Sequence, residues 1–161
     1  MSREDLDNFR ALDDSRKIEF LAHVDEFLEL DFATFLAWLA CDPEQDDLLR
    51  IEAIKVIGLY KGNYDGHLIQ QKILSLALEQ DEDDEIRVYA FNAVSHLEVS
   101  NAEIDASAQT VLSDEYILIK AAAFSLIAQH KHLLVAQAAL RAIQGDEEFG
   151  KAARRELGTL S

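Results

Sequence analysis

The chain has 161 residues with one proline, Pro43, and six glycines, which is too few turn-forming residues for an all-β protein. Its formal net charge of -16 at pH 7 argues against nucleic acid or an anionic membrane as a partner, because both bind positive surfaces. The same charge favours a basic protein partner, since opposite fields raise association rates, although an acidic surface also serves solubility alone.

The first 45 residues predict helices without a repeated pattern. We expect a short helix over residues 3–12, followed by a first helix pair over residues 16–30 and 32–41. This part of the chain is rich in aromatic residues, among them Phe35 and Trp38. Such a segment suits a capping unit that shields the open end of a repeat stack.

The start of the chain reads Met-Ser-Arg-Glu-Asp, and no apolar stretch follows it. We therefore expect no signal peptide. No apolar run approaches the roughly 18 residues of a membrane-spanning helix. Together these features predict a cytoplasmic protein that does not act in a membrane.

Four segments after residue 45 share one pattern: an acid, two residues, an apolar residue, a basic residue, two residues, an alanine and an apolar residue. Internal repeats of this length indicate stacked supersecondary units. The fourth segment is the weakest match, because Gly150 stands where the others have a basic residue. The matched alanines, which lie 37, 33 and 30 residues apart, are Ala53, Ala90, Ala123 and Ala153.

Each repeated position has an expected physical role. The acid can cap the start of a helix and complement its dipole, and the alanine allows two helices to approach closely. The basic residue could reach an aspartate of the neighbouring repeat, in a pair that contributes about 0.2–1 kcal/mol if exposed. The expected caps are Asp46, Asp83 and Asp146, and the expected pairing residues are Arg50, Arg87 and Lys120.

Partner helices are expected between the repeated segments. Their ranges are residues 67–80, 101–112 and 131–143. Ser100 and Glu103, at the start of the second range, have the spacing of a capping box. Each partner helix would form an antiparallel pair with the repeated helix next to it.

The repeated pattern resembles the second helix of HEAT and HEAT-like repeats, including those of the PBS-lyase type, over residues 46–160. The resemblance implies an all-α fold: a short right-handed α-α superhelix, or HEAT-like α-solenoid, of stacked antiparallel helix pairs. We expect one domain over residues 1–161, with an N-terminal helical cap over 1–45 and repeats over 46–161. An irregular helical bundle is the alternative, but a bundle would not need the recurring spacing.

No recognisable catalytic, cofactor-binding or metal-binding site occurs in the sequence. The five histidines form no His-Glu-x-x-His motif and no Cys/His cluster. Glycine-rich phosphate loops and nucleophile elbows are also missing, and Cys41, the single cysteine, is expected to be a small buried hydrophobe. The HEAT-like alkylpurine DNA glycosylases need a basic groove, which this acidic chain does not suggest. We therefore expect no enzyme activity, no cofactor and no metal.

Acidic residues gather in the turns that precede the repeated helices, so a stack would carry them along one edge. Capping accounts for one or two acids in each turn. It does not account for the six acids between positions 79 and 85, where mutual repulsion should cost stability. We expect this cluster to bind a partner through Asp81, Glu82, Asp83, Asp84 and Glu85.

The second helices of a HEAT-like stack normally line its concave surface. Their variable positions are further candidates for partner contact, namely Glu52, Tyr89, Asn92 and His96. An exposed tyrosine in a groove is a common anchor of an interface. Half-buried packing is an equally good interpretation of Tyr89.

The leading hypothesis is a monomeric, non-enzymatic protein-binding module for a basic protein partner. Its most concrete form is a bacterial immunity protein, which neutralises a cognate toxin domain by occlusion. A chromophore-handling HEAT protein of the bilin-lyase type is one alternative, although no clear basic cluster for the propionates is evident in the expected groove. A generic HEAT scaffold or regulatory domain is the other alternative.

Overall fold

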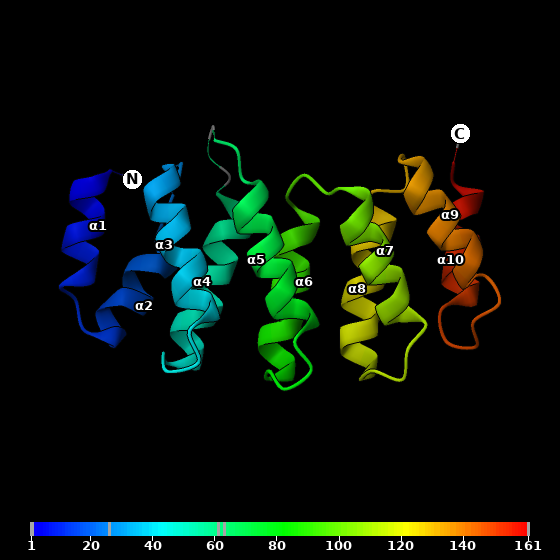
Figure 1. The fold of residues 1–161 in the computed structure, drawn as a ribbon, viewed down its shortest axis with the longest axis horizontal. Coiled ribbons are helices and arrows are strands. Elements are labelled where there is room, and N and C mark those ends of the chain that lie inside the picture. Colours follow the sequence, from blue (N-terminus) through cyan, green and yellow to red (C-terminus); the bar gives the residue numbers. More distant parts are fainter. Residues whose placement is uncertain (1, 26, 61, 63, 161) are drawn as a thin grey trace. The chain divides into compact units, whose positions relative to one another are not determined.

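The computed structural model describes residues 2–25, 27–60, 62 and 64–160. Over these ranges the chain forms ten α-helices and no β-strand (Figure 1), which confirms the all-α prediction. None of the described helices has the length and apolar character needed to cross a bilayer. The chain divides into two compact units, Met1–Leu97 and Glu98–Ser161, and each is described by itself.

Unit 1 is built from two helix pairs and two shorter helices that precede them. Its helices, within the described residues, are α1 (Arg3–Arg10), α2 (Asp14–Ala22), α3 (Leu30–Cys41), α4 (Asp47–Leu59), α5 (His67–Leu78) and α6 (Asp84–Ser95). α3 packs on α4 and α5 packs on α6, and the two pairs meet through α3 on α5 and α4 on α6 (Figure 1). Before them, α1 contacts α3 and α2 contacts α4.

The two helix pairs repeat the same contacts at a spacing of 37 residues. Nε of Arg50 donates a hydrogen bond to the carbonyl oxygen of Ala40, and Nε of Arg87 donates to that of Ala77, each at 2.9 Å. Both arginines are buried, with exposed fractions of 2% and 3%. Each arginine therefore ties the start of the second helix of a pair to the end of the first helix.

The expected aspartate caps are present at α4 and α6. Oδ1 of Asp46 accepts hydrogen bonds from two backbone N–H groups of α4 at 3.0 and 3.2 Å, and Asp83 accepts two from α6 at 2.9 and 3.4 Å. In unit 2, Oδ2 of Asp146 accepts from the backbone N–H of Phe149 at 2.8 Å. There the helix begins only at Gly150, so Asp146 caps the turn that leads into the helix.

Small residues set the distance between α4 and α6. A Cβ atom placed on Gly58 would lie only 2.9 Å from Cα of Ala93, which is closer than two carbon atoms can pack. The matched alanines Ala53 and Ala90 are fully buried. The repeated alanine thus lies in the tightly packed interior of the unit, as the sequence predicts.

Contacts between aromatic rings pack α1 and α2 against α3. Phe9 is fully buried, and its ring centroid lies 5.5 to 5.9 Å from those of three neighbours: Phe20, Phe32 and Phe35. Ring pairs at these separations contribute about 0.5–1.5 kcal/mol beyond their buried area. This cluster allows two short helices to hold their place on the first full pair.

Unit 2 contains four helices in its described residues: α7 (Asn101–Val111), α8 (Ile117–Gln129), α9 (Leu134–Ile143) and α10 (Gly150–Gly158). α7 packs on α8 and α9, and α9 also packs on α8 and α10. The expected capping box opens α7, since the backbone N–H of Ser100 donates to Oε2 of Glu103 at 2.8 Å. Nζ of Lys120 in α8 lies 3.0 Å from Oε2 of Glu148, in the loop before α10.

Two predictions for the start of the chain are wrong. The helix expected over residues 16–30 ends at Ala22, and Leu30 already belongs to α3. Val24 and Leu28 have the spacing of a helical stripe, but they lie in the non-helical stretches 23–25 and 27–29 and are nevertheless buried, with exposed fractions of 8% and 2%. In addition, α3 pairs with α4 and not with the helix before it, so this pair spans the boundary expected at residue 45.

Candidate functional site

Arg50 contacts both the start of α4 and the loop that leads into α6, so these two segments lie side by side in unit 1. Its guanidinium donates to the carboxylate of Glu82 at 2.5 and 3.2 Å, and to Oδ1 of Asp47 at 3.5 Å. The pairing that we expected between neighbouring repeats is confirmed for Arg50, although the acid is a glutamate and not an aspartate. Lys120 and Glu148 make the corresponding pair in unit 2.

In the Arg50–Glu82 pair the arginine is buried and the glutamate half-buried, and the electrostatics of the pair follow from this. Burial alone would raise the pKa of Glu82, but hydrogen bonds from Arg50 and from the backbone N–H of Asp83, with the positive charge of Arg50, hold that pKa below its ordinary value. Burial likewise disfavours the charged form of Arg50. The hydrogen bonds and negative charges of Glu82 and Asp47 more than offset this effect, so the pKa of Arg50 is raised. Both groups therefore stay charged and paired.

The five acids expected to bind a partner separate into two groups. Glu82 is held by Arg50, and Asp83 is the cap of α6, so both have a structural role. The other three are exposed and take part in no ion pair within the part of the chain that the structure describes. We call them the acidic triplet: Asp81, Asp84 and Glu85.

The other expected contact residues continue from the acidic triplet along one face. Glu85, Tyr89, Asn92 and His96 are spaced four, three and four residues apart, which places them on one side of α6 and its C-terminal end. Asn92 and His96 are exposed and Tyr89 is half-buried. The structure thus brings the predicted residues of α6 together.

Glu52 joins this face from the neighbouring helix α4. Its Oε1 lies 2.8 Å from Nζ of Lys55. That hydrogen bond is the largest of the causes that hold the pKa of Lys55 above its ordinary value, and the nearby Tyr89 adds to it. Lys55 therefore lies between the two helices. We call this surface the α4–α6 face, defined by Glu52, Tyr89, Asn92 and His96.

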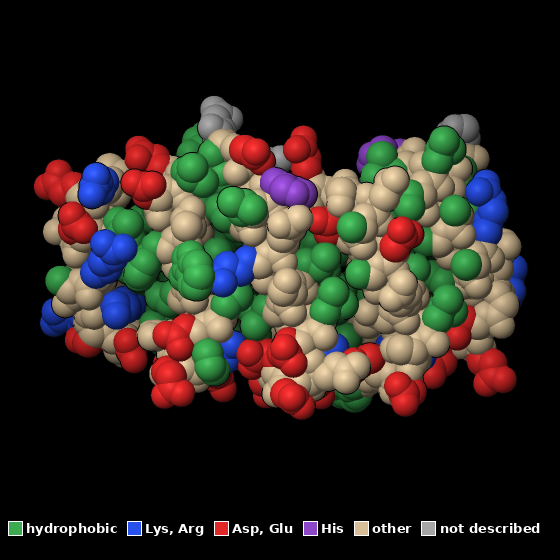
Figure 2. All heavy atoms as spheres, in the orientation of Figure 1, with side chains coloured by type: hydrophobic (Ala, Val, Ile, Leu, Met, Phe, Trp, Pro, Cys, Tyr) green, Lys and Arg blue, Asp and Glu red, His purple; other side chains and the backbone are tan. Residues whose placement is uncertain are grey.

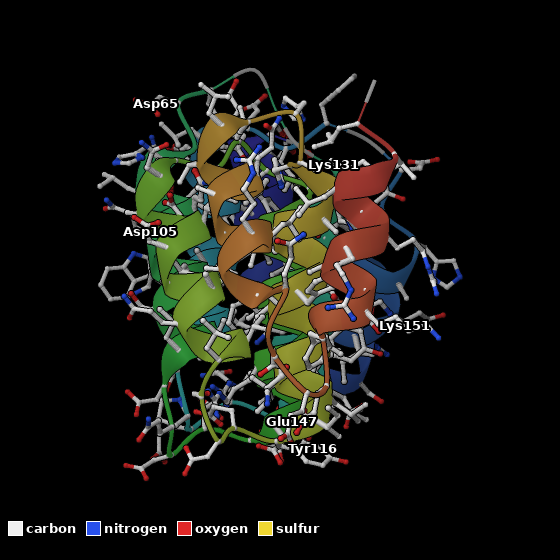
Figure 3. All side chains as sticks on the ribbon, turned by 90° about the vertical axis from the view of Figure 1, so that its right-hand side faces the viewer. Asp65, Asp105, Tyr116, Lys131, Glu147 and Lys151 are labelled. Carbon is white, nitrogen blue, oxygen red and sulfur yellow. The ribbon has the colours of Figure 1, made fainter. Side chains whose placement is uncertain are left out.

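An exposed apolar cluster at the start of α8 was not expected from the sequence. Tyr116, Ile117 and Leu118 are consecutive, with exposed fractions of 51%, 46% and 53%. Tyr116 and Glu147 lie at the same end of unit 2 (Figure 3), where Lys120 links α8 to Glu148. These three residues come just before the buried stripe of α8 begins at Ile119. Their place ahead of that stripe was the feature of the sequence that could have indicated their exposure.

The chemistry of a metal centre is not apparent in the described residues. No group of three or more His, Cys, Asp or Glu side chains in those ranges is arranged to hold a metal ion.

No protein-family model, curated protein or solved structure matches the chain. The interpretation of the acidic triplet and the α4–α6 face therefore rests on their geometry and charge.

Proposed function

We propose that the chain is a non-catalytic binding module for a basic protein, which it contacts through the acidic triplet and the α4–α6 face of unit 1. One observation carries this proposal. Capping and the pair with Arg50 account for Asp83 and Glu82, but neither accounts for the exposed Asp81, Asp84 and Glu85 beside them.

Adjacent carboxylates repel one another, and nothing among the described residues neutralises the triplet. A partner that presents Lys or Arg side chains would relieve this repulsion, and its approach would be accelerated by the net charge of -16. The half-buried ring of Tyr89, on the same side of α6, supplies an amphipathic surface of the kind enriched at interfaces. Charge and apolar contact are therefore offered by one continuous surface.

The proposal extends to the architecture. The contacts repeated between residues 37 apart, Arg50 to Ala40 and Arg87 to Ala77, support a HEAT-like α-solenoid of stacked helix pairs. A basic toxin domain is a partner of the required chemistry. A cytoplasmic bacterial immunity protein that occludes its toxin is the specific form of this proposal.

Capture of a partner with matched variants tests the proposal. The immobilised chain is incubated with a lysate of its host, and bound proteins are identified by mass spectrometry. The test variant neutralises the triplet (Asp81→Asn, Asp84→Asn, Glu85→Gln). The control variant removes three other exposed carboxylates that form no ion pair within the described ranges, and so has the same net charge (Asp25→Asn, Glu98→Gln, Asp105→Asn).

We expect a basic protein that is retained by the control variant and lost with the triplet variant. Titration of the purified partner should show affinity that falls about tenfold or more in the triplet variant, and that falls steeply as salt increases. Equal binding to both variants, affinity that is insensitive to salt, or a captured partner of acidic character would each refute the proposal.

A further inference from the structure

A second surface of unit 1, formed by α1, α2, α3 and α5, is hollowed and carries basic side chains together with three aspartates, Asp7, Asp31 and Asp42. One hollow of about 530 Å³ is lined by residues that include Lys17, Trp38 and Lys72. The adjoining hollow of about 410 Å³ is lined by residues that include Arg10 and Trp38. Phe35 and Trp38 line both hollows, and we call the two together the Trp38 groove.

Trp38 is the single tryptophan of the chain, and its side chain is 64% exposed. Nζ of Lys72 lies 3.6 Å from the centroid of its ring, and the guanidinium carbon of Arg10 lies 4.8 Å from that of Phe35. These are cation–π contacts, which hold each cation over an aromatic face. The groove therefore presents positive charge directly beside exposed apolar surface.

Lys72 is notable because it has no carboxylate partner. The chain has 31 acidic and 15 basic residues, yet within the described residues the ammonium group of Lys72 takes part in no ion pair. Lys17, which lines the same hollow, has only a 3.8 Å contact with Asp14 on its own helix. A ligand carboxylate could approach both lysines.

The acidic residue of this hollow is already engaged. The carboxylate of Asp42 accepts hydrogen bonds from the backbone N–H of Glu44 and from Nε2 of Gln45, both at 3.0 Å. These hydrogen bonds hold Asp42 within its own loop and lower its pKa. Figure 2 shows blue basic side chains and green hydrophobic side chains together over α1, α3 and α5, with red carboxylates at the upper ends of these helices and at the loops below them.

We propose that the Trp38 groove binds an acidic peptide segment that carries a bulky apolar side chain. Its carboxylates lie against Lys72 and Lys17, and its apolar side chain packs on the rings of Trp38 and Phe35. An open groove made of two adjoining hollows fits an extended segment. A nucleic acid is a poorer occupant, because its closely spaced phosphates bring more negative charge than the two lysines of the hollow can match. This site is separate from the acidic triplet and does not depend on the proposed function.

The fluorescence of Trp38 provides a direct test, because every change in tryptophan emission comes from this groove. The probe is a capped hexapeptide, Glu-Asp-Phe-Leu-Asp-Glu, titrated into the intact chain at about 0.15 M salt, where repulsion between the two acidic molecules is screened beyond about 8 Å. We expect a saturable change in emission. The same peptide with Gln and Asn in place of its acids, and a short oligothymidylate, are the comparison ligands, and both should bind at least about tenfold more weakly.

Charge reversal at Lys72 tests whether the peptide contacts this side chain or responds only to the net charge of the protein. Lys72→Glu should weaken peptide binding by about tenfold or more. Lys151→Glu is the matched control, because it makes the same change in net charge at an exposed lysine that lines neither hollow. Far-UV circular dichroism confirms that both variants are folded.

Cys41 supplies a second measurement that does not depend on tryptophan. It lines the same hollow as Lys72 and is the single cysteine, so bound peptide should slow its alkylation by iodoacetamide. The proposal is refuted if the acidic peptide leaves both readouts unchanged. It is also refuted if the neutral peptide or the oligothymidylate binds as tightly, or if Lys72→Glu and Lys151→Glu have equal effects.

Discussion

Arg50 and Glu82 join two successive helix pairs through a bidentate contact, with N···O distances of 2.5 and 3.2 Å. The side chain of Arg50 is 2% exposed and that of Glu82 is 14% exposed. Because the third donor of Arg50, Nε, is bonded to Ala40, one side chain binds the end of α3, the start of α4 and the loop before α6. Loss of this side chain would leave the carboxylate of Glu82 without its ion-pair partner and the carbonyl oxygen of Ala40 without its hydrogen bond from Nε.

Arg50→Met should therefore destabilise unit 1 by roughly 1–3 kcal/mol, the cost typical of removing one partner from buried hydrogen bonds. Urea unfolding followed by Trp38 fluorescence measures this, since Trp38 lies in unit 1. Arg16→Met is the control, because the pair of Arg16 with Asp13 is long and exposed at 3.8 Å, and its loss should change the free energy of unfolding by less than about 0.5 kcal/mol. Similar values for the two variants would show that the buried contact contributes little.

The same pair predicts how stability depends on pH. The pKa of Glu82 is lowered in the folded state, so the folded state binds fewer protons than the unfolded state near the ordinary glutamate pKa. The contribution of Glu82 is therefore present above about pH 4.5, and it is lost as pH falls through the lowered pKa. Wild type and Glu82→Gln should differ in unfolding free energy at neutral pH and converge in acid. A difference that stays constant with pH would contradict this assignment.

Two glycines should respond to alanine with opposite signs. Gly58→Ala places a methyl group 2.9 Å from the backbone of Ala93, and overpacking of this kind costs about 1–3 kcal/mol. Gly158, the last residue of α10, has no atom within 4 Å of the corresponding position, and its φ is not positive. Gly158→Ala should be neutral or stabilise by up to about 1 kcal/mol. Thermal unfolding followed by circular dichroism compares the two, and destabilisation by both would disprove the distinction.

A buried amide gives a stabilising substitution. Gln70 is 5% exposed, and its Nε2 has no hydrogen-bond partner among the described residues. Leaving such a donor unpaired costs about 1–3 kcal/mol, so Gln70→Leu should raise the free energy of unfolding by about 1 kcal/mol. Gln71→Leu, at the exposed neighbour, should leave it almost unchanged. Destabilisation by Gln70→Leu would indicate that the amide is paired in solution.

The repeated helices could be predicted closely because their signals are local. Asp46 and Asp83 mark the starts of α4 and α6, since a cap and its N–H partners are within three residues of each other. The partner helices have local signals of the same kind. The helix expected over 101–112 is α7, and its predicted end differs from the observed one by one residue. Arg50 was expected to pair with an aspartate of the neighbouring repeat. It pairs with Glu82 because the loop before α6 brings that glutamate to the guanidinium, which the sequence does not reveal.

Exposure was harder to predict than helix position. The sequence placed Trp38 in an aromatic-rich capping segment without indicating its exposure. It is 64% exposed, because four phenylalanines already fill the space between α1, α2 and α3. The end of α2 was missed for a related reason. A stripe of buried apolar residues looks the same in the sequence whether a helix or a linker buries it, and only the neighbouring elements decide which it is.

The 37-residue spacing in unit 1 also bears on how such a chain changes length over generations. Each segment brings its own aspartate cap and its own arginine, which bonds to a carbonyl of the same segment. A recombination event that duplicated or removed one whole segment would therefore preserve every one of these contacts. The number of pairs could therefore vary among descendants while the internal chemistry of each pair stayed fixed.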